Sequence, residues 1–515
     1  MYKNIKHVVV VGGGTAGWLV AANLAKQFNS KSPGALKVTL VESPTVPSVG
    51  VGEGTWPTMR KTLANLGIKE TDFIRYCNAS LKQGTKFVDW HNKSAADHYY
   101  HLFTSIFDPS EFNLAPYWQL GKLGRDFTYA EAVSVQGEIC DLNLSPKTIT
   151  NREYEGMQNY AYHLDAALFA KMLTEHSTQV LGVNHIRADV EHCKLTKNGC
   201  IEAIQTKQGH IVEGEFFVDC TGFRAKLIGE TLKVPFKPIN DVLLTDHAVT
   251  IQIPYQPEDD EVSSCTLSTA QEAGWIWDIG LASRRGTGYV YSSNHTSHER
   301  AEQVLRDYLG PQAEGLDARR IPMQLGYREK FWHKNCLAVG LSASFVEPLE
   351  ASAIFLIEAS ANMLTKLLPA NTAGLALSEK MFNESFSFRY HKTVDFIKMH
   401  YLLSNRKESF WTDNKQPDTI PKSLQMKLEQ WQSRPLNDYD FDNVYEPFPL
   451  ESYQYVLYGM GFKQDLIQRE MQYSEVARAQ HSCAQVQQIK SKLRDQLPTN
   501  RELLEKLRDY EFQAI

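Results

Sequence analysis

The first fifty residues carry a hydrophobic pattern that predicts a strand, a turn, a helix and a second strand. Residues 7–11, "HVVVV", are a continuous apolar run, as in a strand buried on both faces of a parallel sheet. Apolar residues recur at helical spacing in 18–28, "WLVAANLAKQF", and 36–42, "LKVTLVE", is again strand-like. The glycine-rich segment 12–17, "GGGTAG", separates the first strand from the helix. This order predicts the opening βαβ unit of an α/β fold.

A second region with the same alternation lies at about 160–225. There the pattern predicts a helix at 164–176 and short strands within 184–190, 194–206 and 214–222. From about residue 360 the chain is mostly helical and polar, and helices are expected near its end at 485–497 and 500–512. We expect a Rossmann-type nucleotide-binding α/β unit built from separated segments, an inserted mixed-sheet part and a C-terminal helical part.

Two tryptophans stand at alternate positions in "GWIWDIG", residues 274–280. In a strand, residues i and i+2 share a face, so Trp275, Trp277 and Ile279 would lie on one side and the two indoles would form a flat wall. A strand packed on a core explains the same pattern without any functional role.

Composition narrows the class of protein. The chain has 515 residues, which favours more than one structural unit, and its 43% hydrophobic and 22% charged residues are ordinary for a globular protein. A formal net charge of −6 without a long basic cluster argues against nucleic acid or an anionic membrane as partner. Eight scattered cysteines without C-x-x-C predict neither a disulfide framework nor a metal site, and they fit a reducing cytoplasm.

Targeting and membrane segments are not predicted either. The opening apolar run is too short for the core of a signal peptide. The most apolar long stretch, about 336–364, is interrupted by Glu347, Glu350 and Glu358, and charged residues make a membrane span costly. We therefore expect a cytoplasmic protein.

The glycine turn has the spacing of a dinucleotide site, G-x-G-x-x-G, at Gly12, Gly14 and Gly17. The first glycine allows the tight turn, the second lets the backbone approach a pyrophosphate, and the third allows close packing of helix on strand. Thr15 and Ala16 open the helix, whose N–H groups favour a phosphate. Glu42 ends the second strand, where a carboxylate accepts hydrogen bonds from ribose hydroxyls.

Three further segments favour FAD over NAD as the dinucleotide. The glycine-rich loop 49–59 contains Gly52 and Glu53, "FFVDCTGF" contains Asp219 and Gly222, and Gly340 follows another strand. Several separated segments converging on one dinucleotide are typical of large FAD-dependent oxidoreductases. No second G-x-G-x-x-G is present for NAD(P)H, so the flavin would be reduced by another protein.

From about residue 5 to 460 the chain resembles the flavin-dependent halogenases that include the tryptophan halogenases. The resemblance is carried by "GGGTAGW", "GVGEGTWPTM", "HYYHLF" (98–103), "YHLDA" (162–166), "GWIWDIG" and "FVEPLEASAIF" (345–355). It implies a GR2-like FAD-binding region at 1–360, with inserted segments at about 60–150 and 240–320, and a helical region at 361–515 that completes the substrate pocket. It also implies that reduced FAD, O₂ and a halide generate hypohalous acid, which halogenates an electron-rich aromatic ring.

The resemblance assigns the catalytic pair to Lys82 and Glu350. The lysine of the family holds the oxidised halogen, and the glutamate assists the electrophilic step. Lys86 is the rival lysine, for which we expect an ordinary structural role, and Glu347 is the alternative glutamate if the register differs by one turn. The two indoles of Trp275 and Trp277 would then form a wall beside the flavin.

Three positions depart from the family motifs. W-x-W-x-I-P has Gly280 in place of proline, and the positions usually held by a serine and a glycine after the glutamate are Ala351 and Ala353. The halide of the family sits on backbone amides in this loop, which Ser352 and Ala353 still supply. A looser site would favour a larger anion, so we lean towards bromide over chloride.

The substrate side departs further. His101 and Phe103 match positions that line the indole pocket, although a packed core pair is an equally good explanation. The segment 444–462, which would grip the ammonium and carboxylate of an amino acid, looks shortened and contains no tryptophan. We therefore expect an indole-type or phenolic substrate rather than free tryptophan.

Two other functions stay open at this stage: a flavin-dependent aromatic hydroxylase and a non-catalytic FAD-binding protein. For the halogenase, the expected partners are a separate NAD(P)H-dependent flavin reductase and a small aromatic substrate, and a homodimer is an open alternative to a monomer.

Overall fold

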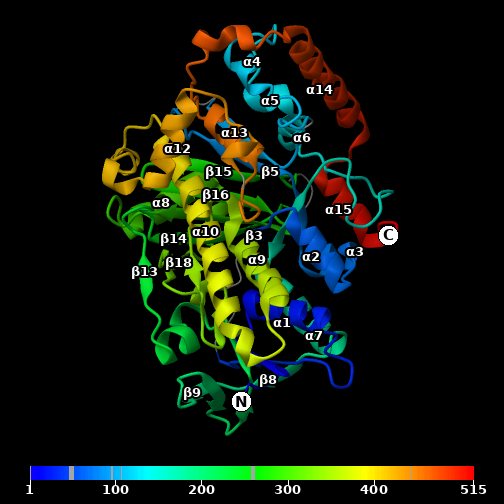
Figure 1. The fold of residues 1–515 in the computed structure, drawn as a ribbon. Helices are drawn as coiled ribbons and strands as arrows, with labels where there is room; N and C mark the ends of the chain where they lie inside the picture. Colours follow the sequence, from blue (N-terminus) through cyan, green and yellow to red (C-terminus); the bar gives the residue numbers. More distant parts are fainter. Residues whose placement is uncertain are drawn as a thin grey trace. The chain divides into compact units, whose positions relative to one another are not determined.

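The chain folds into two units, each assembled from three separated segments. Figure 1 labels the helices and strands along the ribbon. The computed structural model describes residues 2–45, 52–93, 97–105, 107–256, 261–441 and 443–514. Unit 1 comprises Met1–Ala79, Leu164–Ile239 and Gln324–Tyr390, and unit 2 comprises Ser80–His163, Asn240–Met323 and His391–Ile515.

A six-stranded sheet forms the centre of unit 1. Its strand order is β20-β21-β12-β1-β2-β8, and β1 runs parallel to both of its neighbours. Val8, Val9 and Val10 of β1 are completely buried, as the continuous apolar run predicted. The strands are β1 (His7–Val11), β2 (Lys37–Glu42), β8 (Asn184–Arg187), β12 (Phe216–Asp219), β20 (Trp332–His333) and β21 (Cys336–Ala338).

Helix α1 (Thr15–Gln27) follows β1 directly and packs against α7 (Ala166–Gln179) and α9 (Ser352–Leu367). The predicted opening βαβ order is therefore confirmed, and so is the helix expected within 164–176. Unit 1 also contains two smaller sheets, β9-β10-β11 and β13-β19-β22. Its remaining elements are β3 (Gly52–Gly54), α2 (Thr58–Leu66), α3 (Glu70–Tyr76), β9 (Val190–Leu195), β10 (Ile201–Thr206), β11 (Ile211–Glu213), β13 (Phe236–Pro238), β19 (Gly326–Arg328) and β22 (Ser344–Phe345).

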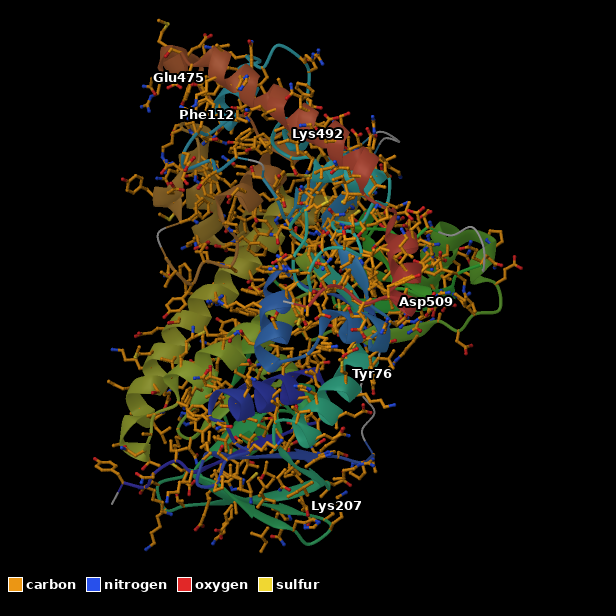
Figure 2. All side chains as sticks on the ribbon, turned by 90° about the vertical axis from the view of Figure 1, so that its right-hand side faces the viewer. Tyr76, Phe112, Lys207, Glu475, Lys492 and Asp509 are labelled. Carbon is orange, nitrogen blue, oxygen red and sulfur yellow. The ribbon has the colours of Figure 1, made fainter. Side chains whose placement is uncertain are left out.

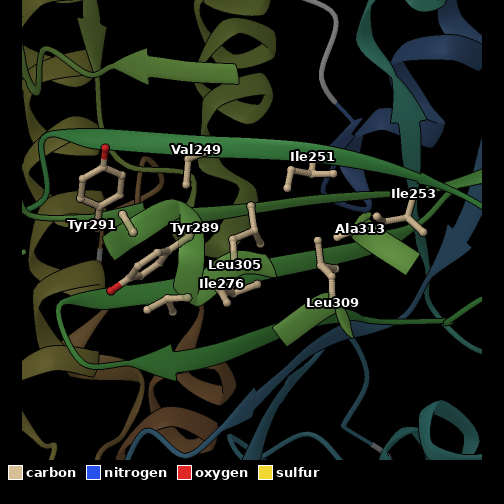
Figure 3. Packing of buried hydrophobic residues seen from close by; sticks show 11 residues of the cluster. Val249, Ile251, Ile253, Ile276, Tyr289, Tyr291, Leu305, Leu309 and Ala313 are labelled. Atoms are coloured by element: carbon tan, nitrogen blue, oxygen red, sulfur yellow. The ribbon is translucent and has the colours of Figure 1, made fainter. Parts of the chain in front are cut away.

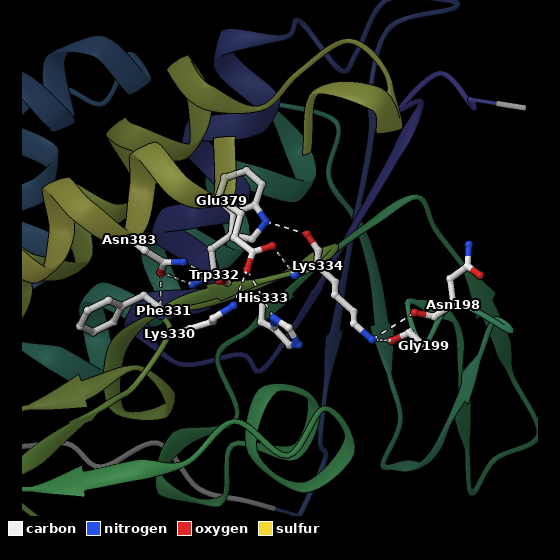
Figure 4. Close-up of polar contacts among 9 residues, drawn as sticks. All are labelled: Asn198, Gly199, Lys330, Phe331, Trp332, His333, Lys334, Glu379 and Asn383. Carbon is white, nitrogen blue, oxygen red and sulfur yellow. Dashed lines mark hydrogen bonds and ion pairs between the residues drawn. The ribbon is translucent and has the colours of Figure 1, made fainter. Parts of the chain in front are cut away.

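A polar network ties the β20–β21 hairpin to the first half of α10 (Leu375–Leu402), the helix within which the chain passes from unit 1 into unit 2 (Figure 4). The Asn383 side chain accepts the N–H groups of Phe331 and Trp332 at 2.9 and 3.0 Å. Glu379 accepts the Lys334 N–H at 3.0 Å and pairs with the Lys330 ammonium at 3.2 Å. The hairpin thus keeps its backbone groups satisfied at the edge of the sheet.

A seven-stranded, mostly antiparallel sheet is the core of unit 2. Its order is β18-β14-β17-β16-β15-β5-β6. Strand β16 contains "GWIWDIG" with the bounds that the alternation predicted. The strands are β5 (Gly84–Val88), β6 (His98–Leu102), β14 (His247–Pro254), β15 (Thr266–Gln271), β16 (Gly274–Gly280), β17 (Arg284–Tyr291) and β18 (Arg319–Pro322).

Helix α8 (His298–Leu309) covers one face of this sheet. Its Leu305 and Leu309 pack on Val249 and Ile251 of β14 and on Ile276 of β16 in one hydrophobic cluster (Figure 3). Burial of such side chains contributes about 1.5–3 kcal/mol each relative to exposure.

The C-terminal part of unit 2 is helical, as predicted. Helix α14 packs against α5, and α15 packs against strand β4 (Ser80–Lys82). Figure 2 labels Glu475, the residue before α14, Lys492 on α14, and Asp509, the last residue of α15. The C-terminal helices are α11 (Ser409–Asp413), α12 (Lys422–Gln432), α13 (Leu450–Gly459), α14 (Val476–Gln496) and α15 (Asn500–Asp509), and the Ser80–His163 segment adds α4 (Ala115–Gln119), α5 (Tyr129–Val133) and α6 (Gln136–Asp141).

Within the described ranges, none of these helices has the length and apolar content needed to cross a membrane.

Candidate functional site

The glycine turn of unit 1 has the close contacts that its spacing predicted. A Cβ on Gly17 would lie 1.8 Å from the Gly12 carbonyl oxygen, so helix and strand approach too closely for any side chain. A Cβ on Gly14 would meet nothing within 4 Å. The backbone at Gly14 therefore faces open space at the start of α1, where a pyrophosphate needs access to N–H groups.

Three separated segments of unit 1 meet around this turn. A Cβ on Gly12 would lie 2.1 Å from the carbonyl oxygen of Cys220, which follows β12. A Cβ on Gly340 would lie 2.9 Å from the Cβ of Ala16 in the first turn of α1. Gly222, like Gly14, would place its Cβ in open space. Two of the further segments expected at an FAD-type site, those that carry Gly222 and Gly340, therefore approach this turn.

Glu42 lies beside the turn at the end of β2. Its carboxylate accepts a hydrogen bond from the His185 imidazole at 2.9 Å and is 27% exposed. A Cβ on Gly13 would lie 2.2 Å from the Glu42 Cδ, so the carboxyl group rests against the turn. It keeps acceptor capacity for a ribose hydroxyl, because a carboxylate has about four acceptor positions.

The Asp219 carboxylate is used within its own loop. It is completely buried and accepts the N–H groups of Thr221, Leu227 and Ile228 at 2.8–3.0 Å. Burial raises the pKa of the Asp219 carboxyl above its usual value, although these donors favour the ionised form. Asp219 therefore shapes the segment that carries Gly222.

Glu53 follows Gly52 in β3 and is half-buried. Burial raises the pKa of its carboxyl to about 7. Residues 49–51 of this glycine-rich loop lie outside the described residues.

The glutamate expected to be catalytic, Glu350, lies in a strained turn before α9. Glu350 has φ 66° and the next residue, Ala351, has φ 53°, two consecutive left-handed residues that are not glycine. The Glu350 carbonyl accepts the indole N–H of Trp56 at 2.7 Å. The Glu350 side chain is 7% exposed, and its rival Glu347 is completely buried.

Ser352 begins α9 directly after this turn. Its side chain is completely buried, and its Oγ has no hydrogen-bond partner among the residues that the structure describes. The first N–H groups of a helix have no partner within the helix and carry a partial positive charge. This hydroxyl and the first turn of α9, which includes Ala353, together fit a small anion.

Lys82 lies in unit 2, at the end of the short strand β4, and is 1% exposed. It pairs with Ala161 of β7 (Ala161–Asp165). Two bonds anchor its neighbours: the Asn500 side chain donates to the Leu81 carbonyl at 3.0 Å, and the Gln83 N–H donates to the Ser264 carbonyl at 2.7 Å. The lysine backbone is therefore held on both sides.

Phe103 lies next to Lys82. The Lys82 ammonium is 5.6 Å from the centroid of the Phe103 ring, within the range of a cation–π contact. The Phe103 N–H donates to the Gln83 carbonyl at 3.2 Å, which fixes this arrangement. The rival Lys86 forms an ion pair with Asp141 at 2.6 Å.

His163 is a completely buried imidazole opposite Ser80 in the β4–β7 pair. Its Nε2 is 2.8 Å from the Thr266 hydroxyl. Burial, followed by the charge of Lys82, lowers the His163 pKa well below its usual value. The ring therefore stays neutral beside the lysine.

His101 is packed among aromatic side chains and is 6% exposed. Its Nε2 is 2.8 Å from the hydroxyl of Ser452 in α13, and its ring lies 5.4 Å from Phe396 and 6.2 Å from Phe448. Phe396 and Phe448 stack at 3.7 Å. Segment 444–462 thus lies against β6 through α13.

Trp275 and Trp277 share a face of β16, but their rings are inclined by 59° with centroids 6.4 Å apart. The expected flat wall is wrong in this respect. Trp277 lies over Gly288 of the neighbouring strand, where a Cβ would be 2.1 Å from the indole, whereas Trp275 contacts Trp90 at 6.3 Å. The different neighbours explain the different ring planes. Ile279, on the same face, is buried.

The sequence and structure comparisons agree on one family. A family model described as tryptophan halogenase matches residues 7–474. The chain belongs to the tryptophan halogenase family. The resemblance to flavin-dependent halogenases is thereby confirmed, and so is the expectation of an enzyme.

Individual relatives are similar over most of their length. Tryptophan 6-halogenase SttH of Streptomyces toxytricini is 36% identical over 479 residues, which are 89% of this chain and 90% of that protein. The crystal structure of a tryptophan halogenase from Shewanella frigidimarina NCIMB 400 has a TM-score of 0.94 and 43% identity and covers 100% of this chain and 99% of its own. BrvH, a flavin-dependent halogenase from Brevundimonas sp. BAL3, has a TM-score of 0.86 and 31% identity and covers 98% and 99%.

The departure of this halogenase chain at Gly280 has a local cause. A Cβ on Gly280 would lie 2.9 Å from the Tyr255 hydroxyl and 3.0 Å from the Ser263 nitrogen. The Gly280 carbonyl accepts the hydroxyl of Ser80 at the start of β4. Glycine therefore makes room for Tyr255 while the carbonyl keeps its contact with the lysine strand.

Sequence reasoning missed Trp56, Asn500 and His163. Trp56 stands in the segment "GVGEGTWPTM", and its place in that segment is the signal that could have indicated a role. Asn500 lies beyond the end of the family match at residue 474, in a segment whose sequence predicted only a helix.

Proposed function

We propose that this enzyme uses reduced FAD, O₂ and a halide, bromide in preference to chloride, to halogenate an electron-rich aromatic compound of indole type that is not free tryptophan. The oxidised halogen is hypohalous acid, and Lys82 receives it.

The burial of Lys82 is the observation that carries this proposal. Lysine is almost never completely buried unless it is paired, and Lys82 is 1% exposed with its ammonium over the ring of Phe103. An ammonium is a compact donor that can hold hypohalous acid by a hydrogen bond. The neighbouring His163 imidazole is neutral, because its pKa is lowered, so it is not a second cation that could hold hypohalous acid.

Glu350 and Ser352 supply the other two functions in this proposal. The Glu350 carboxylate accepts the proton that leaves the ring during electrophilic substitution. The halide sits at the first turn of α9, beside the buried Ser352 hydroxyl and the N–H groups of Ser352 and Ala353.

The described residues of unit 1 fit FAD, because the turn at Gly14 is open and three segments converge on α1. When bound, reduced FAD would supply two of the four electrons that reduce O₂, and the halide would supply the other two, so that one oxygen atom ends in hypohalous acid and the other in water. The residues that would hold FAD are Gly12, Gly14, Thr15, Ala16, Gly17, Glu42, Gly52, Glu53, Asp219, Gly222 and Gly340.

An indole-type substrate is supported by the aromatic surroundings of His101 and Phe103. The ring contacts of His101 are to Phe396, Phe448 and Tyr455. Aromatic side chains favour a planar, electron-rich ring by offset or edge contacts. Trp275, Trp277 and Ile279 would line the path of hypohalous acid.

A separate NAD(P)H-dependent flavin reductase completes the system in the cytoplasm. The chain contains a single G-x-G-x-x-G turn, which would be occupied by FAD. Its eight cysteines are all free, as expected in a reducing compartment.

The test combines the purified enzyme with FAD, NADH, a generic flavin reductase, bromide and a panel of indoles and phenols. Mass spectrometry detects the bromine isotope doublet, and a monochlorodimedone trap detects hypobromite that finds no substrate. We expect Lys82→Ala to abolish the brominated product and the matched variant Lys86→Ala to retain it. Bromination that survives in Lys82→Ala contradicts the role of Lys82. Hydroxylated product alone identifies a hydroxylase. If the assay yields no brominated product and no trapped hypobromite, halogenation is refuted.

A further inference from the structure

The turn that contains Glu350 is held in a conformation that its own residues do not favour. Glu350 (φ 66°, ψ 8°) and Ala351 (φ 53°, ψ 36°) are both left-handed, and neither is glycine, asparagine or aspartate. Each Cβ in such a conformation is crowded by the backbone, so surrounding contacts must maintain it.

One side chain contacts the turn at its centre. The Trp56 indole N–H donates to the carbonyl oxygen of Glu350 at 2.7 Å, a short and well-formed bond. This carbonyl precedes the Ala351 nitrogen, so the bond fixes the peptide plane between the two left-handed residues. The N–H of the same peptide, that of Ala351, donates to the Pro348 carbonyl at 3.0 Å, so the indole holds one side of the plane and the turn holds the other.

The indole ring is itself fixed by stacking. Trp56 and Phe355 lie parallel, with centroids 3.9 Å apart and an interplanar angle of 16°. On Phe355, the Arg389 guanidinium lies 5.4 Å from the ring centroid. Phe355 belongs to α9, one turn after Ser352, so the indole bridges the turn and the helix that follows it.

A second contact fastens the same two segments. Thr58 and Thr62 of α2 donate to the carboxyl group of Glu358 in α9 at 3.2 and 2.5 Å. Residues 56–62 are therefore joined to α9 at two points, Phe355 and Glu358. Trp56 is the contact that reaches Glu350.

We propose that Trp56 is a positioning residue for halogenation: its N–H holds the Glu350–Ala351 turn left-handed, which sets the direction of the Glu350 carboxylate and of the first turn of α9. This inference rests on the proposed role of Glu350. Without the indole N–H, the carbonyl loses this donor, and only the bond from the Ala351 N–H to the Pro348 carbonyl still opposes rotation of the peptide among the contacts described here. The carboxylate then leaves the site of the electrophilic step, and oxidised halogen escapes.

Two substitutions separate the N–H from the ring. Trp56→Phe keeps an aromatic ring for the stack on Phe355 and removes the donor. Trp56→His keeps a donor, because its Nε2 can occupy the position of the indole nitrogen. Codon suppression with 3-benzothienylalanine at position 56 keeps the shape of the indole and replaces only the N–H by sulfur, so the test does not depend on Trp56→Phe folding.

The assay measures moles of bromoindole formed from indole per mole of NADH oxidised, together with trapped hypobromite and the KM for bromide. We expect the removal of the N–H to lower the yield of bromoindole at least tenfold and to raise trapped hypobromite, with a melting temperature close to that of the unsubstituted enzyme. Trp56→His should retain the yield within about threefold. Crystal structures of the variants should show φ of Glu350 leaving the left-handed region only where the N–H is missing.

Glu350→Gln, measured in parallel, distinguishes a failure of the proposed role of Glu350 from a failure of the positioning role of Trp56. If Glu350→Gln brominates indole as well as the unsubstituted enzyme, the proposed role of Glu350 is wrong. If Glu350→Gln is impaired while the benzothienyl variant keeps its yield and a left-handed Glu350, the positioning role of Trp56 is wrong.

Discussion

Replacing Glu358 by glutamine should remove a loss of stability that the enzyme suffers as the pH rises. Glu358 lies in α9, is 2% exposed and accepts the hydroxyl groups of Thr58 and Thr62. Burial raises the pKa of its carboxyl from 4.5 to about 7. Glutamine can keep both contacts, because hydroxyl groups act as donors or acceptors, and it never ionises.

The size and sign of the effect follow from proton linkage. Between pH 4.5 and 7 the unfolded chain has released the Glu358 proton while the folded chain retains it, so the free energy of unfolding falls as the pH rises and levels off above the folded pKa. The pKa difference corresponds to about 3 kcal/mol at 1.36 kcal/mol per unit. For a domain of a few hundred residues, that is a difference in melting temperature of roughly 5–10 °C.

The assay is the melting temperature of the FAD-free protein at pH 5 and pH 8, followed by circular dichroism. The unsubstituted protein should lose several degrees more than Glu358→Gln over this interval. Glu53, whose carboxyl pKa is also raised to about 7, is common to both proteins and cancels in the comparison. Glu384→Gln, which alters a 66% exposed carboxylate in α10, is the matched control and should follow the unsubstituted protein. An equal change in Glu358→Gln and the unsubstituted protein would refute the reasoning.

Three other predictions concern packing and the cofactor site. Gly14→Ala should fold normally and bind FAD more weakly in a fluorescence titration. Gly17→Ala, whose Cβ would lie 1.8 Å from the Gly12 oxygen, should instead lower the melting temperature. Equal effects of the two variants would contradict the different roles assigned to these glycines. Gly280→Pro, which restores the usual family residue, should destabilise the protein because of Tyr255, and adding Tyr255→Phe should recover part of the melting temperature. Asn500→Ala leaves the Leu81 carbonyl without this donor, and it should cost about 1–3 kcal/mol of stability in thermal melts and lower the yield of brominated product.

The sequence predicted those parts of the fold whose signals are local. The buried run of β1, the spacing of Gly12, Gly14 and Gly17, and the alternation in β16 are each complete within a few residues, and the structure confirms the elements that they predict. The convergence of Gly12 and Gly340 was predicted from the arrangement typical of large FAD-dependent oxidoreductases, not from a local pattern.

Other parts of the site depend on contacts between distant residues that leave no pattern in the chain. The indole N–H of Trp56 meets a carbonyl 294 positions away, and nothing in "PLEASA" signals two left-handed residues. The tilt between Trp275 and Trp277 depends on Gly288 of the next strand and on Trp90. Spacing gives the face on which a side chain lies, whereas its ring plane depends on its neighbours.

The substitution of glycine for proline at Gly280 is compatible with the chemistry of the family. The carbonyl at this position is common to both residues, and in this enzyme it accepts the Ser80 hydroxyl two residues before Lys82. What glycine changes is the opposite side of the strand, where it admits the hydroxyl of Tyr255. The aromatic strand therefore stays connected to the lysine strand at a position where the family motif has proline.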